Sequence, residues 1–89
     1  MCDRNAVLDK AKNIINGERQ DQYGKPENNF AVIAGMWSCY LGMRIKEVDV
    51  AMMMALLKIA RIESGTMTED SFVDLIGYAA LGSELVNRG

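Results

Sequence analysis

The alternation of apolar and polar positions along the chain follows the spacing of amphipathic helices. In the first segment the apolar positions recur three and four residues apart, after Asp3, which suits a helix N-cap. This helix is expected from about Arg4 to Asn16-Gly17, because glycine tolerates the left-handed conformation that ends many helices. A second helix is expected to begin at Pro26, whose missing N–H costs nothing in a first turn, and to close at Gly42.

Two more helices are expected in the second half of the chain. The third spans about Glu47 to Glu63 and the fourth about Glu69 to Asn87, after a Thr-Met-Thr-Glu run that is typical of a capping box. No segment alternates with the period of two that a half-buried strand requires. The prediction is therefore all-α, a four-helix compact domain over residues 1–89, with Trp37 in its core. The core stripe predicted for the fourth helix consists of Phe72, Leu75, Ile76, Ala79, Ser83 and Val86.

The chain carries more apolar surface than four such helices can hide. No charge interrupts residues 28–43, and the run Val50-Ala51-Met52-Met53-Met54-Ala55-Leu56-Leu57 is apolar on every side of its helix. A helix that is apolar all round must be buried all round, and both segments are too short to span a membrane. We therefore expect a homodimer or higher oligomer, whose interface the three methionines would help to fill. The alternative is a compact monomer that hides them under its first helix.

The charge balance and the absence of histidine restrict the chemistry. Ten lysines and arginines stand against twelve acidic residues, and the net charge of −2 argues against direct nucleic-acid binding. Without histidine, histidine-dependent catalysis and histidine metal ligands are excluded. Cys2 and Cys39 are too few for a disulfide framework, which indicates a reduced, cytoplasmic compartment. Asp3 and Arg4 stand where the apolar core of a signal peptide would begin, so no leader is expected.

Charged residues of both signs fall on the third and fourth helices. Lys58 and Arg61 share one face of the third helix, and Asp70 and Asp74 lie one turn apart on the fourth. Two ionised carboxylates repel each other unless a cation lies between them. That cation could be the Lys58/Arg61 pair across an inter-helix groove, or Mg²⁺ whose remaining ligands a phosphate would supply. The structural alternative is an ion-pair cluster that ties the two helices together.

A second polar group precedes the second helix. Arg19 offers a planar fork for phosphate, Tyr23 offers a ring for stacking, and the Asn29 amide could read a base edge. Alternatively, Arg19 and Asn29 could hydrogen-bond the Tyr23-Gly24 turn itself. Tyr78, at the border of the polar side of the fourth helix, offers a second stacking ring.

Many of these residues follow one another in a specific order. The pattern is Arg19-x-x-x-Tyr23-Gly24, Asn29-Phe30, Trp37, Asp49-Val50-Ala51, Leu57-Lys58-Ile59-Ala60-Arg61 and Asp70-x-x-x-Asp74-x-x-Gly77-Tyr78. It resembles a family of short phage and prophage proteins of unknown function. The tyrosine-glycine turn and the Lys-x-x-Arg and Asp-x-x-x-Asp helices are also similar, more distantly, to phage nucleotide-modification-associated domains. Those domains are in turn similar to the MazG-like, all-α nucleoside triphosphate pyrophosphohydrolases.

The wider resemblance implies a helical dimer or tetramer whose inter-helix groove handles a nucleotide. The pyrophosphohydrolases hold Mg²⁺ with two acidic pairs on neighbouring helices, whereas Lys58 and Arg61 stand here where the second acidic pair would be. Hydrolysis with two metal ions needs more anionic oxygen than Asp70, Asp74 and Glu84 provide. The sequence therefore favours binding over catalysis, and we assign no catalytic residue.

The resulting hypothesis is a phage-encoded protein in the cytoplasm of an infected or lysogenic bacterium. It would bind a nucleotide or another phosphorylated small molecule in an inter-helix groove and could sequester a host or defence signal. One alternative is a Mg²⁺-dependent pyrophosphohydrolase with Asp70 and Asp74 as metal ligands. Another is a protein-binding inhibitor of a host factor that uses Met52 to Met54 and the Trp37 face as its contact. The ligand-binding residues of the main hypothesis are Arg19, Tyr23, Asn29, Lys58, Arg61, Asp74 and Tyr78.

Overall fold

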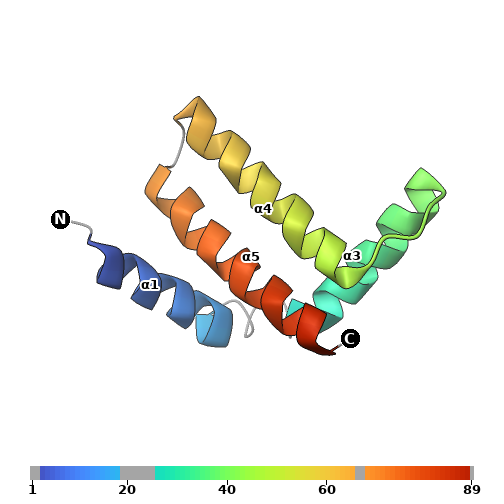
Figure 1. The fold of residues 1–89 in the computed structure, drawn as a ribbon, viewed down its shortest axis with the longest axis horizontal. Coiled ribbons are helices and arrows are strands. Elements are labelled where there is room, and N and C mark those ends of the chain that lie inside the picture. The colour runs from blue at the N-terminus through green and yellow to red at the C-terminus, as the bar shows by residue number, and fades with distance from the viewer. Residues whose placement is uncertain (1–2, 19–25, 66–67, 89) are drawn as a thin grey trace.

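A computed structural model describes residues 3–18, 26–65 and 68–88, and these residues form four α-helices and one π-helical turn (Figure 1). The all-α prediction is therefore confirmed, with helix bounds close to those expected. The elements are α1 (Arg4–Asn13), which continues as the π-helical turn η1 (Ile14–Glu18), then α3 (Pro26–Leu41), α4 (Glu47–Ser64) and α5 (Thr68–Arg88).

Several helix ends lie at capping residues. Asp3 Oδ1 accepts a hydrogen bond from Ala6 N at 2.8 Å and so caps α1. Gly42 follows α3 with φ +69°, and Gly65 ends α4 with φ +79°. Both glycines therefore adopt the left-handed conformation that residues with a Cβ atom rarely take. The predicted stop at Asn16-Gly17 is wrong, because α1 changes to π geometry at Ile14 and this turn continues through Gly17 to Glu18.

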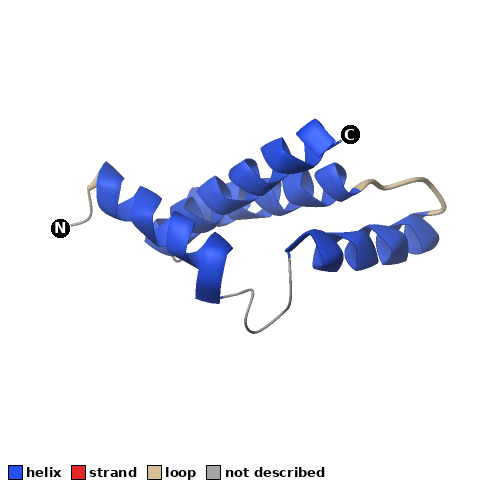
Figure 2. Ribbon diagram, turned by 90° about the horizontal axis from the view of Figure 1, so that it is seen from below, coloured by secondary structure: helices blue, strands red, loops and turns tan. Residues whose placement is uncertain are grey.

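Helices α4 and α5 form an antiparallel pair, and the other elements pack against it. α1 lies along α5 on the side away from α4, whereas α3 crosses the start of α4 and extends outward (Figure 1, Figure 2). The core lies where α3 meets α4, with Phe30 and Ala34 packed against Val50 and Ala51. Its partly buried neighbours are Ile33, Trp37, Ile45, Met54, Tyr78, Leu81 and Leu85.

The stripe predicted for the core side of α5 is mostly wrong. Phe72, Ala79, Ser83 and Val86 are exposed, and only Leu75 and Ile76 are half-buried. The side of α5 that packs inward instead mixes small residues with larger apolar and polar ones. They are Ser71, Val73, Asp74, Gly77, Tyr78, Leu81, Gly82 and Leu85.

Two glycines explain why α5 packs on that side. A Cβ atom placed on Gly82 would lie 2.8 Å from Met52 Cε and 3.4 Å from Ala51 Cβ, so the backbones of α4 and α5 approach closely there. On the side facing η1, a Cβ atom on Gly77 would lie 3.5 Å from Ile15 Cγ1. Small residues let helices come together, and a pattern of large apolar residues does not reveal such contacts.

We expect Gly77→Ala to raise the free energy of unfolding by about 0.5–1 kcal/mol, because alanine favours the helix and 3.5 Å is ordinary van der Waals distance. Chemical denaturation measures the change. Gly65→Ala is the control, and the left-handed backbone at that position should make it lose about 1 kcal/mol. A loss for Gly77→Ala would mean that η1 packs against α5 more tightly than the structure shows.

A large part of the apolar surface faces outward. The exposed large apolar side chains are Leu8, Val32, Met36, Tyr40, Leu41, Met43, Met52, Met53, Leu56, Leu57, Ile59, Phe72 and Val86. Within residues 3–18, 26–65 and 68–88, no helix is both long enough and apolar enough to cross a lipid bilayer. Most of these side chains lie on α3 and α4, the helices whose apolar excess the sequence indicated.

Candidate functional site

The charged residues predicted on α4 and α5 meet in part. Lys58 Nζ lies 3.1 Å from Asp74 Oδ2, and the two side chains are only 17% and 11% exposed. The pair therefore bridges α4 and α5 at a site that is largely withdrawn from water. Arg61 and Asp70 are exposed on the same two helices. This geometry agrees with the structural alternative for Lys58 and Asp74, an ion pair that ties the helices together.

The predicted stacking residues have different surroundings. The Tyr78 ring lies on that of Phe30, with ring centroids 6.2 Å apart and an interplanar angle of 29°. One side of Tyr78 therefore packs in the core between α5 and α3. Asn29 is exposed at the start of α3. Arg19 and Tyr23 lie outside the described residues.

The proposed metal ligands Asp70 and Asp74 are not part of a larger acidic group. In the part of the chain that the structure describes, no three side chains of histidine, cysteine, aspartate or glutamate gather where they could hold a metal ion. Asp74 also contacts the Lys58 ammonium, which competes with a metal for the same carboxylate. Magnesium at Asp70 and Asp74 stays a prediction that would depend on oxygen atoms from a bound phosphate.

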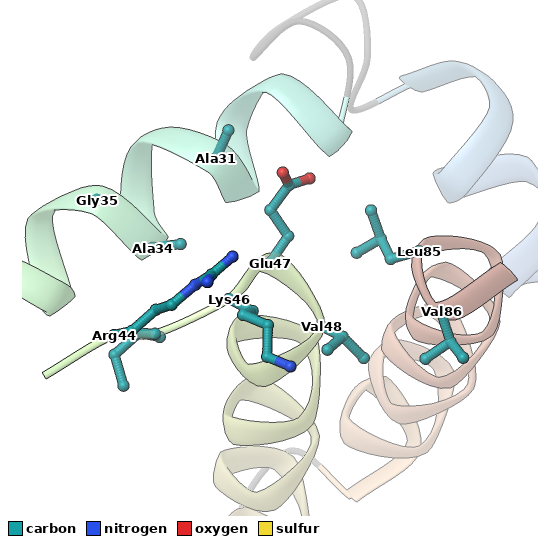
Figure 3. A pocket seen from close by; sticks show the side chains of 10 residues that line it. Ala31, Ala34, Gly35, Arg44, Lys46, Glu47, Val48, Leu85 and Val86 are labelled. Carbon is teal, nitrogen blue, oxygen red and sulfur yellow. The ribbon is translucent and has the colours of Figure 1, made fainter. Parts of the chain in front are cut away.

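A cleft of about 740 Å³ lies at the other end of the α4–α5 pair (Figure 3). The start of α4 and the linker 42–46 form one side, α3 forms a second side, and the end of α5 closes a third. We call it the α3–α4–α5 cleft. Its lining residues are Ala31, Ala34, Gly35, Arg44, Ile45, Lys46, Glu47, Val48, Leu85 and Val86.

Hydrogen bonds fix the linker that carries the charged residues of this cleft. Ser38 Oγ accepts from Ile45 N at 2.8 Å and donates to Ala34 O at 2.7 Å, which ties the linker to α3. Asp49 Oδ2 accepts from Lys46 N at 2.9 Å, which fixes the first turn of α4. Because the backbone is held on both sides of Arg44, its side chain and that of Lys46 start from a defined edge of the cleft.

The electrostatics of the α3–α4–α5 cleft favour an anion. Arg44 and Lys46 bring two cations, against one carboxylate from Glu47. The first turn of α4 adds the partial positive charge of a helix N-terminus, which the acidic residues Glu47 and Asp49 in that turn partly offset. Apolar side chains cover the remaining walls, with Leu85 and Val86 on α5 opposite α3 (Figure 3). A ligand with an anionic group and an apolar or aromatic body matches this combination.

Arg44 and Lys46 are not among the ligand-binding residues predicted from the sequence. A signal was present, since both cations stand in a short linker between two helices rich in apolar residues. Arg44 and Lys46 line the cleft only because of the path that the linker takes in space. The hydrogen bond from Ile45 N to Ser38 Oγ determines that path. The spacing of residues along the chain does not predict the path of the linker.

Comparison with known proteins places the chain in a family. Residues 6–86 match the family described as Domain of unknown function (DUF6378). The chain belongs to the DUF6378 family. Its relatives include the Gene 55 protein of Mycobacterium phage D29, with 45% identity over 83% of the chain and 49% of the relative. The Gene 55 protein of Mycobacterium phage L5 is 42% identical over 85% of the chain and 49% of the relative.

These matches confirm the expected similarity to phage proteins. The DUF6378 match includes α4, α5 up to Val86 and every residue that lines the α3–α4–α5 cleft. The chain spans about half the length of the curated relatives it matches. No solved structure matches it. The function of this DUF6378 chain must therefore be argued from its own geometry.

Proposed function

We propose that this DUF6378 chain binds a nucleotide or another phosphorylated small molecule in the α3–α4–α5 cleft. The observation that carries the proposal is the pairing of Arg44 and Lys46 with the N-terminal turn of α4 at the edge of a cleft whose walls are partly apolar. Arginine and lysine both bind phosphate, arginine through a planar fork and lysine as a point charge.

The size and walls of the cleft support a small molecule as the ligand. Its volume of about 740 Å³ lies within the range of roughly 300–1,000 Å³ that is usual for such sites. The residues of α3 that line the cleft, Gly35 and two alanines, are small and so project little into it. Leu85 faces them from α5 (Figure 3). A base or another flat apolar group would fit between these walls while its phosphate lies at the linker.

The same residues favour binding over hydrolysis. Cleavage of a diphosphate with two metal ions needs several carboxylates and a general base. Glu47 is the carboxylate among the residues that line the cleft. A protein that binds a nucleotide without consuming it lowers the free concentration of that nucleotide, so sequestration of a host or defence signal is the activity we propose.

Nucleotides should raise the thermal midpoint of the protein. Ligand at a hundredfold excess over Kd stabilises the folded state by about 2.7 kcal/mol. We expect a shift with mono-, di-, tri- or cyclic nucleotides, and Arg44→Gln and Lys46→Gln should each weaken binding about tenfold by removing a charged hydrogen bond. Thermal-shift titration of the variants checks this, followed by calorimetry with the nucleotide that gives the largest shift.

Three further variants make the test specific. Arg4→Gln and Lys12→Gln remove the same charges from exposed positions on α1 and should leave the affinity unchanged. Gly35→Leu adds an apolar side chain where no atom lies within 4 Å of the new Cβ, so it should block the cleft without changing the charge. Unchanged midpoints across the whole nucleotide panel would refute the proposal, and so would full binding by the Arg44→Gln/Lys46→Gln double variant.

A further inference from the structure

The outward sides of α3 and α4 carry apolar side chains at helical spacing. On α3, Val32, Met36 and Tyr40 recur at intervals of four residues and share one side of the helix, and Met43 is exposed just beyond its end. On α4 the exposed apolar side chains are Met52, Met53, Leu56, Leu57 and Ile59. We call these two sets together the α3–α4 apolar face. Its most exposed member is Tyr40, at 90%.

The inward sides of the same helices already have partners. Val50 and Ala51 pack against Phe30 in the core, and Lys58 pairs with Asp74 of α5. The α3–α4 apolar face is therefore the opposite side of helices whose core contacts are complete. A rotation of either helix that buried its outer side would expose the core instead, so neither helix can cover this face by turning.

The solvent-accessible surface of the chain is larger than that expected of a compact monomer of the same mass. The chain exposes 6350 Å², whereas a compact monomer of 9.9 kDa exposes about 5,200 Å². The difference of about 1,100 Å² is larger than the roughly 800 Å² that each partner contributes to a standard interface. The radius of gyration agrees, at 13.6 Å against about 12 Å for a compact domain of this length.

We propose that a second copy of this chain covers the α3–α4 apolar face in a two-fold symmetric homodimer. A two-fold interface uses the same surface on both protomers, and long apolar helix faces suit helix-on-helix packing. Methionine side chains adapt to irregular gaps in such an interface. The net charge of −2 disfavours an anionic lipid surface as the occupant, because interfacial helices are usually rich in lysine and arginine.

The proposal goes beyond ligand binding and does not depend on it. The α3–α4 apolar face and the lining of the α3–α4–α5 cleft share no residue. Oligomeric state without ligand therefore tests the dimer alone, and a failure of either proposal leaves the other intact.

Sedimentation equilibrium over a micromolar concentration series is the decisive measurement. We expect the wild-type chain at twice its mass of 9.9 kDa, dissociating at the low end of the series. Leu56→Glu should raise the dimer Kd about thirtyfold or more, because it places a charge in the middle of the interface. Met36→Lys should do the same from α3. Both side chains are exposed within the protomer, so circular dichroism should show unchanged helix content.

Leu8→Glu is the matched control, since Leu8 is an exposed apolar residue on α1, on the far side of α5 from α4 (Figure 1). It should leave the dimer intact. A wild-type chain that stays monomeric throughout the series would overturn the proposal and assign the face to another protein or a lipid. A Leu56→Glu chain that dimerises like wild type, or a Leu8→Glu chain that dissociates equally, would place the interface elsewhere and overturn it too.

Discussion

Replacing Lys58 by alanine is expected to lower the free energy of unfolding by about 3 kcal/mol, and Asp74→Ala should cost a similar amount. The pair joins α4 to α5 at 3.1 Å with side chains 17% and 11% exposed. Removal of one charge takes this ion pair away from the other at a site that is largely withdrawn from water. For a domain of this size, such a loss lowers the thermal midpoint by about 12 °C or more. Urea denaturation and calorimetry measure the two quantities.

The exposed pair between α1 and α5 supplies the control for this result. Lys10 Nζ lies 2.7 Å from Glu69 Oε1, closer than in the Lys58–Asp74 pair, but the side chains are 56% and 47% exposed. Lys10→Ala should therefore cost less than about 1 kcal/mol. The double variant Lys58→Met/Asp74→Leu should recover most of the loss, because apolar groups of similar volume replace the buried charges. A neutral or stabilising Lys58→Ala would instead indicate that this lysine is kept for an external ligand.

The helix bounds could be predicted because local residues determine them. Gly42 and Gly65 follow α3 and α4 with left-handed backbones, and Asp3 caps α1 through its own side chain. These interactions lie within a few residues of each other along the chain. Spacing and capping rules therefore identify them without any knowledge of the tertiary structure.

The orientation of α5 could not be predicted, because small residues determine it. A count of large apolar residues favoured the side of Phe72 and Val86, and both are exposed. In the structure α5 turns Gly77 and Gly82 inward, with η1 in van der Waals range of Gly77 and α4 closer still to Gly82. Close approach of two backbones gains many contacts, whereas the residues that permit it carry no hydropathy signal.

The two candidate sites also differ in how far the sequence could predict them. Lys58 and Asp74 could be paired from sequence because each lies on a helix with a predictable periodicity. The α3–α4–α5 cleft could not be found, because Arg44 and Lys46 lie in a linker whose course depends on the bond between Ser38 and Ile45. Helical periodicity predicts which residues share a face, but it does not predict where a linker runs.

Phe30→Ala should lower the free energy of unfolding by about 3–4 kcal/mol. Phe30 is 5% exposed and packs with Ala34 against Val50 and Ala51, and its ring lies on Tyr78 of α5. It is the largest buried side chain that α3 contributes to the core. Its removal weakens the attachment of α3, so hydrogen exchange in α3 should accelerate more than in α4 or α5. Tyr78→Phe keeps the stacked ring and should cost less than about 1.5 kcal/mol.

Phe72→Ala makes the same chemical change on α5, where the side chain is 44% exposed. It should cost only about 1 kcal/mol, because a half-exposed ring loses much less apolar burial and leaves no enclosed cavity. The comparison also tests the orientation of α5, since Phe72 belongs to the stripe that the sequence predicts as buried. Equal losses for Phe30→Ala and Phe72→Ala would show that α5 turns that stripe toward the core. We expect Phe30→Ala to lower the free energy of unfolding several times more than Phe72→Ala, because the inward side of α5 is the one that carries Gly77 and Gly82.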